Sequence, residues 1–207
     1  FISLFSFVDG KEIKRFQAHP QSAYAVKFSP DARKIYTLHE DGVFQAIDSQ
    51  TGSAVYSNRL HPNISRTMAV SPDGRFIATG SNDKTVKVID AETFQEKFVF
   101  GSSLKPLYMV AFSADSNLLA AAGADDFVRI YRMADGKLLH ELSGMSAGVF
   151  AVTFSPDGKR LATSSDVGVI RFWEVESGRQ VLAFTAGKKQ ITQLKFTSDG
   201  KMLISVD

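Results

Sequence analysis

FSPD at residues 28–31 is the most informative stretch of this chain, because closely similar segments return at a fixed interval. The later copies are VSPD at 70–73, FSAD at 112–115, FSPD at 154–157 and FTSD at 196–199. Successive copies are 42 residues apart, and an aspartate occupies the same place in all five. A strict period of this length indicates a repeat architecture built from one small supersecondary unit.

Two further columns of residues keep the same period. One column is aromatic or aliphatic, and the other holds glycine in four of its five copies. The first contains Phe5, Ile47, Ile89, Tyr131 and Trp173, and the second contains Gly10, Gly52, Phe94, Gly136 and Gly178. Three columns that share one period cannot be a result of composition alone.

Within each unit the local pattern predicts strands rather than helices. AYAVKF (23–28) and VFAVTF (149–154) are short and rich in β-branched and aromatic residues. The turn that follows suits its proline, which fixes φ, and its aspartate, which can bond the backbone two residues on. Later short runs such as KRLATS (159–164) and VIRFWE (169–174) complete four strands in each 42-residue unit. No stretch shows helical spacing, so an all-β chain is expected.

Four short antiparallel strands per repeat describe a blade of a β-propeller. One small sheet cannot cover both of its apolar faces, whereas sheets stacked around an axis cover one another. The repeat therefore predicts a single propeller domain, or part of one, over residues 1–207. Whole blades are expected at about 19–60, 61–102, 103–144 and 145–186, with half blades at 1–18 and 187–207.

These residues resemble the WD-repeat β-propeller family across the whole chain. The family pattern has a Gly-His near the innermost strand, a Trp-Asp at the end of the third strand, and a Ser or Thr and an Asp that complete a hydrogen-bonded tetrad. Here the Trp-Asp pair appears once, as Trp173-Glu174, and no repeat carries the full tetrad. The resemblance implies structural roles for the matching positions, which are His19, Thr37, Asp41, His61, Thr79, Asp83, Asp125, Thr163 and Trp173.

The two half blades are complementary, since the chain opens on a third and fourth strand and closes on a first and second. Together with the four whole blades they amount to five. One interpretation is a closed five-bladed ring with a shared closing blade. The other is part of a larger ring, since members of the family commonly have seven blades. The absence of an initial Met and the end at Asp207 favour the second interpretation, in which open apolar faces need further chain or a partner.

Composition excludes several classes of function. Lys and Arg number 24 and Asp and Glu number 22, so the net charge of +2 gives no electrostatic case for binding nucleic acid or an anionic membrane. The absence of cysteine excludes disulfides, thiolate metal sites and thiol nucleophiles. No apolar run reaches the length of a membrane span, and the opening FISLFSFVDG lacks the basic region of a signal peptide. We expect an intracellular protein, cytoplasmic or nuclear.

Motifs for catalysis or metal binding are weak. GMSAG at 144–148 matches the G-x-S-x-G pattern around Ser146, but that motif needs a strand–turn–helix setting and a later histidine, and none follows His140. The four histidines do not form a ligand set with short spacing. The repeated aspartates are explained by their turns, and no asymmetric carboxylate pair stands out. We expect no catalytic residue, metal, cofactor or small-molecule substrate.

The resemblance implies that partners dock on the face that carries the loops before the innermost strands. Large, rigid side chains with a polar end make good interface anchors, and an arginine such as Arg66 is hard to bury without a partner. The aromatic candidates could instead pack between blades. The expected partner-binding residues are Arg66, Tyr108, Tyr24, Phe150, Glu40, Asn82 and Asp166.

The sequence therefore favours a non-enzymatic scaffold, a subunit of a multiprotein complex that binds a peptide or a domain on its loop face. Its partners would be other proteins, with no nucleic acid or membrane bound directly. The alternative is a five-bladed propeller enzyme or lectin-like binder with a ligand site at the axis. That site would need converging carboxylates or aromatics, whereas the innermost strands supply mostly Ala, Val, Met and Thr.

Overall fold

The computed structural model describes residues 1–17, 19–101, 103–145 and 148–207, and every regular element in these ranges is a β-strand. Sixteen of the strands form four sheets, each made of four consecutive antiparallel strands. The all-β prediction and the prediction of four-stranded antiparallel blades are thereby confirmed. Since the described ranges contain no helix, no helix in them could cross a membrane.

The blades follow the repeat in chain order. The first blade contains β3 (Ala23–Phe28), β4 (Lys34–His39), β5 (Val43–Asp48) and β6 (Ala54–Arg59). The second contains β7 (Ser65–Val70), β8 (Phe76–Ser81), β9 (Val86–Asp90) and β10 (Glu96–Phe100). The third contains β11 (Leu107–Phe112), β12 (Leu118–Gly123), β13 (Val128–Arg132) and β14 (Leu138–Leu142). The fourth contains β15 (Val149–Phe154), β16 (Arg160–Ser165), β17 (Val169–Glu174) and β18 (Gln180–Thr185).

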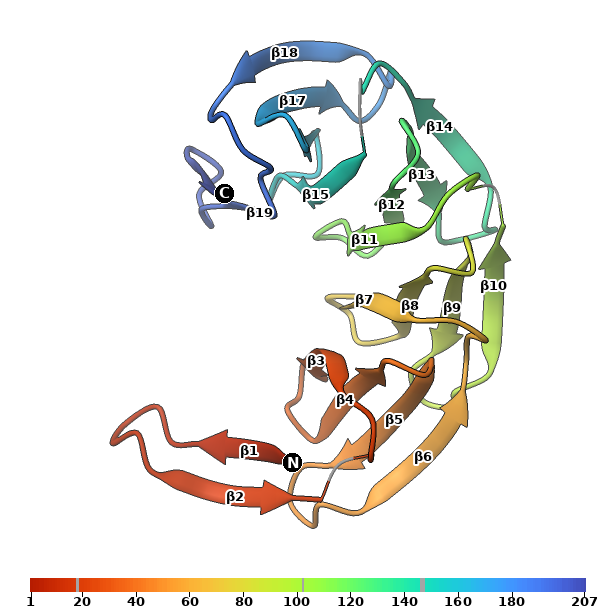
Figure 1. Cartoon of the computed structure of the whole chain (residues 1–207), viewed down its shortest axis with the longest axis vertical. Coiled ribbons are helices and arrows are strands. Elements are labelled where there is room, and N and C mark those ends of the chain that lie inside the picture. Colours follow the sequence, from red (N-terminus) through yellow and green to blue (C-terminus); the bar gives the residue numbers. More distant parts are fainter. Residues whose placement is uncertain (18, 102, 146–147) are drawn as a thin grey trace.

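The four blades lie side by side along an open arc (Figure 1). The first strand of each blade lies on the inside of the arc and the fourth on the outside, so β3, β7, β11 and β15 are neighbours in that order. A two-stranded hairpin lies at each end of the arc. The N-terminal hairpin is β1 (Ile2–Phe5) and β2 (Glu12–Phe16), and the C-terminal hairpin is β19 (Gln193–Phe196) and β20 (Leu203–Val206).

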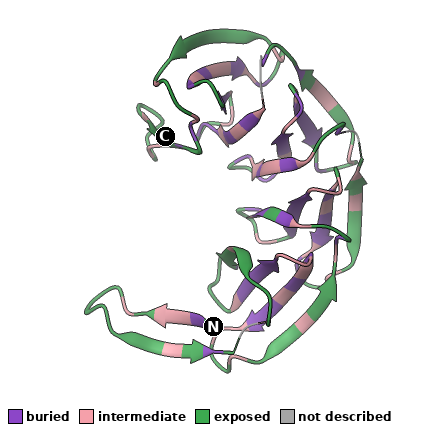
Figure 2. Cartoon of the chain, viewed as in Figure 1, coloured by how far each residue is buried: buried purple, intermediate pink, exposed green. Residues whose placement is uncertain are grey.

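The apolar core lies between blades rather than within one. Figure 2 shows burial concentrated on the middle strands of the blades, whereas the outermost strands β6 and β18 are exposed along most of their length. Tyr36 and Phe44 of the first blade pack in one cluster with Met68 and Ile77 of the second. Each buried side chain of this kind removes apolar area from water only because a neighbouring sheet covers it. The blades therefore depend on one another for stability.

The turn at each FSPD-like segment explains why an aspartate returns in every repeat. In the first blade the Ser29 hydroxyl donates to the Asp31 carboxylate at 2.6 Å, and the backbone N–H groups of Arg33 and Lys34 donate to Asp31 and Ser29. In each repeat this hydroxyl is the largest of the causes that lower the pKa of the aspartate, and at Asp73 the larger effect of burial opposes it. The same hydroxyl–carboxylate bond occurs at Ser71–Asp73, Ser113–Asp115, Ser155–Asp157 and Thr197–Asp199. The pKa is lowered in all five aspartates.

The two hairpins do not join each other. β1–β2 and β19–β20 are separate two-stranded sheets at opposite ends of the arc (Figure 1), so the described residues do not form the shared closing blade of a five-bladed ring. The ends of the arc are correspondingly exposed. Val26 of β3 is 47% exposed, whereas Val110 and Val152, which occupy the same place in β11 and β15, are each 4% exposed.

The repeat also defines the register that a shared closing blade would have. Ile35 of β4 pairs with Ile47 of β5. The residue equivalent to Ile35 in the C-terminal hairpin is Leu203, and the residue equivalent to Ile47 in the N-terminal hairpin is Phe5. In the open arc these two residues belong to different sheets. We expect no disulfide in the double variant Phe5→Cys, Leu203→Cys after mild oxidation, as measured by mass spectrometry of the monomer.

The matched control is the double variant Gln45→Cys, Ser57→Cys, because these residues face each other across β5 and β6. It should oxidise readily, since directly opposite strand positions bring the Cβ atoms close enough for a disulfide. The chain has no cysteine of its own to compete. If the disulfide between positions 5 and 203 formed within one molecule at the rate of the control, the arc would be shown to close.

Candidate functional site

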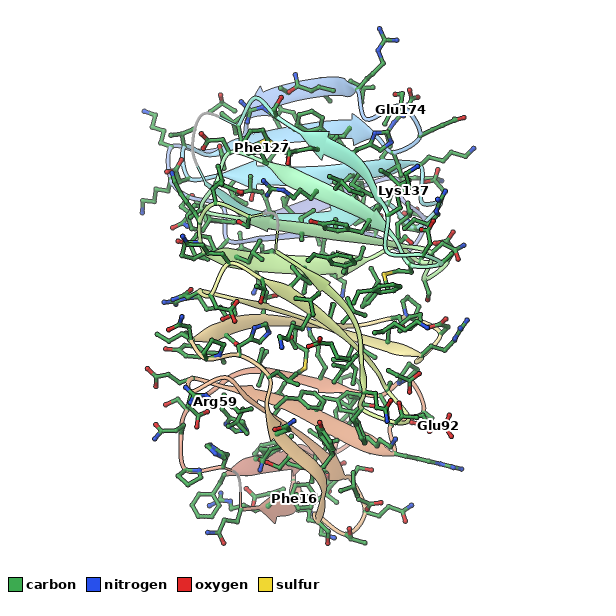
Figure 3. The ribbon with its side chains drawn as sticks, turned by 90° about the vertical axis from the view of Figure 1, so that its right-hand side faces the viewer. Phe16, Arg59, Glu92, Phe127, Lys137 and Glu174 are labelled. Atoms are coloured by element: carbon green, nitrogen blue, oxygen red, sulfur yellow. The ribbon has the colours of Figure 1, made fainter. Side chains whose placement is uncertain are left out.

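The turns that follow the second strands and the loops that precede the first strands lie on one side of the arc, which we call the loop face. Figure 3 shows this geometry from the side: Arg59 and Phe127 lie along the loop face, and Glu92 and Glu174 along the opposite face. The polar side chains beneath the loop face differ from blade to blade, although the strands are closely alike.

The second blade has the most complete polar network. His61 is buried, its Nδ1 lies 2.8 Å from Asp83 Oδ2, and its Nε2 lies 2.8 Å from Thr79 Oγ1. A neutral ring with its proton on Nδ1 satisfies both bonds, donating to Asp83 and accepting from Thr79. Burial lowers the pKa of His61, and the bond to Asp83 offsets only part of that effect. The aliphatic Ile89 stands where the family pattern has tryptophan.

The first blade uses a histidine that the repeat columns do not single out. Thr37 Oγ1 lies 2.9 Å from Nε2 of His39, so His39 makes the hydrogen bond expected of His19. His39 Nδ1 lies 3.1 Å from the Gln21 carbonyl oxygen, and burial lowers the pKa of His39. His19 packs against the His39 ring at 4.7 Å between centroids, with its Nε2 3.6 Å from Asp41.

The third blade replaces the tetrad with a buried ion pair. Asp125 Oδ2 accepts from Arg129 Nη1 at 2.7 Å and from the Ser103 hydroxyl at 3.1 Å. Arg129 also donates to Glu141 Oε2 at 3.0 Å, and both Asp125 and Arg129 are only 3% exposed. Ala121 occupies the place of the tetrad hydroxyl, so the arginine supplies the donor that the repeat lacks there.

The fourth blade has the tryptophan and the threonine of the tetrad but lacks its histidine and its aspartate. The Trp173 indole N–H donates to Thr163 Oγ1 at 3.0 Å, and both side chains are buried. The histidine place holds the buried Met145, and the aspartate place holds Val167, which is exposed. Four blades therefore satisfy the same buried position with four different sets of partners.

The loop face brings together most of the expected partner-binding residues. Tyr24, Arg66, Tyr108 and Phe150 are each the second residue of an innermost strand, in blades one to four. The Arg66 guanidinium carbon lies 5.7 Å from the centre of the Tyr24 ring, and Arg66 Nε donates to Asn82 Oδ1 at 3.3 Å.

The other two aromatic residues of this group, Tyr108 and Phe150, stack with their centroids 5.1 Å apart. Both are half-buried, so the aromatic pair serves packing between blades and contact with solvent at the same time. We call the group Tyr24, Arg66, Asn82, Tyr108 and Phe150 the anchor cluster.

A recess of about 470 Å³ opens beside the anchor cluster. Its walls come from the second, third and fourth blades and from the segment directly before β19. The lining residues are Arg66, Asn82, Pro106, Tyr108, Met109, Phe150 and Thr192. A larger groove of about 700 Å³ runs along the inside of the arc, and Arg66 and Met109 line both hollows.

Three of the expected partner-binding residues do not line the recess, and the first of them, Tyr24, lines the groove along the inside of the arc instead. Glu40 is half-buried in the β4–β5 turn, where its backbone N–H donates to the Ser22 carbonyl at 2.9 Å. Asp166 is exposed in the β16–β17 turn. Ser146, the centre of the GMSAG motif, lies outside the described residues. Among the residues that the structure describes, no group of three or more His, Cys, Asp or Glu side chains could hold a metal.

Sequence reasoning missed Arg129, His39 and Met109. Ala121 in the hydroxyl column, followed by the turn aspartate Asp125, is the sequence signal that could have indicated Arg129. Met109 lies one place after the column of Tyr24, Arg66, Tyr108 and Phe150, so the repeat gives it no signal. Arg59 was also missed, although its guanidinium joins two loops by donating to the carbonyls of Asp41 and Pro62 at 2.9 and 2.8 Å.

The buried ion pair of the third blade makes a stability prediction. Arg129→Met should lower the free energy of unfolding by about 3–5 kcal/mol, because it leaves the Asp125 carboxylate buried without its cation. The double variant Asp125→Asn, Arg129→Met should recover much of this loss, since the uncompensated charge is gone. Urea denaturation followed by tryptophan fluorescence would measure both.

The control is Arg132→Met, which breaks the exposed ion pair with Asp135 in the same blade. Exposed pairs contribute little to stability because solvent screens them, so the effect should be far smaller. If Arg129→Met is no more destabilising than Arg132→Met, the buried pair does not stabilise the third blade as described.

The two buried histidines predict a pH dependence. Because burial lowers the pKa of His39 and His61 from 6.5, the unfolded chain binds more protons than the folded one as the pH falls below that value. Stability should be full above about pH 6.5 and should decrease toward about pH 5, while the turn aspartates stay ionised. His61→Gln should show a smaller decrease than the wild type when urea midpoints at the two ends of this range are compared. An equal decrease would mean that His61 does not contribute.

The comparisons with known families agree with this architecture. A family model described as WD domain, G-beta repeat matches residues 52–90, and a model described as the Anaphase-promoting complex subunit 4 WD40 domain matches residues 110–199. No curated protein matches the chain. Domains of this type generally mediate protein–protein interaction. The matches fall on the 42-residue repeats and on the antiparallel blades that those repeats form, and together they support a WD-repeat family for this chain.

Proposed function

We propose that this domain is a non-enzymatic scaffold that binds a peptide or a domain of another protein on its loop face, as a subunit of a multiprotein assembly. The anchor cluster carries the proposal. It collects two tyrosines, a phenylalanine and an arginine from four different blades. Arg66, Tyr108 and Phe150 line the recess, and Tyr24 lines the adjoining groove. Such side chains dominate binding energy when they lie at the centre of an interface.

The geometry of the cluster supports a binding role because its members are held before a partner arrives. Arg66 is fixed by Tyr24 on one side and Asn82 on the other, and Tyr108 is stacked on Phe150. A side chain that is already ordered loses less conformational entropy on binding, so more of its contact energy appears as affinity. The strand beneath each anchor fixes its position within its own blade.

One observation supports a place within a larger assembly. A matching family model describes a subunit of a complex, the Anaphase-promoting complex subunit 4 WD40 domain. An intracellular location, cytoplasmic or nuclear, is part of the same proposal.

The alternative with a ligand site at the axis receives less support. The groove along the inside of the arc is lined by the innermost strands, and no carboxylate is among its lining residues. A glycosidase site needs a carboxylate pair, and a metal site needs clustered ligands. The lining offers mainly apolar side chains, a few uncharged polar ones such as Thr67 and Gln193, and the two cations Lys27 and Arg66 instead.

The proposal predicts that Arg66→Ala and Tyr108→Ala each weaken binding of the partner by on the order of 2 kcal/mol, about thirtyfold in Kd. The partner would be captured with the wild-type domain, purified, and titrated against each variant by calorimetry. Arg33→Ala is the matched control, because Arg33 is an exposed arginine in the β3–β4 turn. If all three folded variants bind like the wild type, the loop-face site is wrong.

A further inference from the structure

We propose that the anchor cluster recognises an acidic side chain, the carboxylate of an Asp or Glu within an extended peptide segment, with Arg66 as its counter-ion. This inference rests on the proposed function, because it assigns a ligand chemistry to the same surface. It is carried by the contacts of Arg66, by the charges around it, and by the way the two hollows meet at that residue.

Arg66 holds a positive charge that its neighbours orient without neutralising. Tyr24 offers its ring face and Asn82 offers an amide oxygen, and both are uncharged. The ion pairs found among the described residues involve other side chains. The contact with Asn82 uses Nε, so the two terminal nitrogens at the tip of the guanidinium are left for a ligand. That pair of donors matches the two oxygens of a carboxylate.

The surroundings of Arg66 favour an anion. The residues that line the recess include no Asp or Glu, and the same holds for the groove along the inside of the arc. Lys27 adds a second positive charge to the groove. The chain as a whole is nearly neutral, so this lack of acidic side chains is a local property of the surface. Complementary charge across an interface selects the partner and directs its approach.

The charge at the recess fits one carboxylate better than a phosphate. Arg66 is the single cation among the residues that line the recess. Phosphorylated segments are usually held by clusters of arginines, since a phosphate carries between one and two charges and three acceptor oxygens. One guanidinium is matched in charge and in geometry by one carboxylate.

The position of Arg66 indicates an internal acidic residue rather than a chain end. Arg66 and Met109 line both the groove and the recess, so a segment that crosses Arg66 has room on either side of it. On the recess side the stacked rings of Tyr108 and Phe150 offer an apolar wall, and Met109 adds an adaptable one. The segment that fits therefore carries a large apolar residue next to its acidic one.

A peptide array can test this chemistry with the intact domain. The probes are heptapeptides capped at both ends, with Glu, Gln, Lys or phosphoserine at the centre and aromatic, aliphatic or polar residues on each side. The fluorescently labelled domain is applied as wild type and as Arg66→Gln, Arg66→Lys, Tyr108→Ala and the control Arg33→Gln. The strongest peptides are then titrated in solution by fluorescence anisotropy.

The wild type should bind Glu-centred peptides with an apolar neighbour about tenfold more tightly than their Gln-centred counterparts. Arg66→Gln should abolish that preference, and Arg66→Lys should retain a weaker form of it, since lysine keeps the charge without the fork. Tyr108→Ala should weaken Glu-centred and Gln-centred peptides alike and leave their ratio unchanged. Arg33→Gln should behave like the wild type.

Three results would overturn the inference. Equal binding of Glu-centred and Gln-centred peptides, still weakened by Tyr108→Ala, removes the acidic preference and leaves the docking proposal standing. A preference for phosphoserine over Glu that depends on Arg66 assigns the site to phosphorylated segments instead. Failure of every peptide to bind at millimolar concentration rejects a short acidic segment as the ligand, and the proposed function is then judged by the affinities measured with the captured partner.

Discussion

The burial of one sheet by the next is the constraint on which the whole molecule depends. The second strand of a blade is buried along nearly its whole length, so both of its faces need cover that a single blade in water would not have. The clusters that link Tyr36 to Ile77 and Tyr131 to Phe76 each cross a blade boundary. The regular spacing of the blades follows from this, because every junction must bring equivalent apolar faces together. The loop face in turn follows from the regular spacing, since it aligns the second residue of each innermost strand.

Beneath the loop face, the requirement that buried polar groups be paired is stronger than any requirement for particular residues. His61 with Asp83, His39 with Thr37, Arg129 with Asp125, and Trp173 with Thr163 meet that requirement in different ways. An unpaired buried polar group costs more than the difference between one adequate pair and another. The third blade is the least complete, because Asp125 Oδ1 is buried without a hydrogen-bond partner among the described residues.

The fold could be predicted from the sequence, because period and turn chemistry are local properties that repeat five times. The polar networks could be predicted only where a residue stays in its column, as His61 does. Arg129 shares its column with Gln45, Lys87 and Arg171, which are all half-buried, so nothing in the column marks it as a core residue. Its burial comes from Asp125, a contact that no periodicity reveals. The recess was equally hidden, because Pro106 and Met109 matter only once neighbouring blades have been packed together.

The open arc has a mechanical consequence. A closed ring resists bending because its circumference is fixed, whereas an arc can widen or tighten by small rotations that add up from one junction to the next. The recess is lined by the second, third and fourth blades, so its width depends on the angle at two of these junctions. A ligand that fills the recess would therefore favour one angle at these junctions over others, because it binds most tightly where the walls fit it.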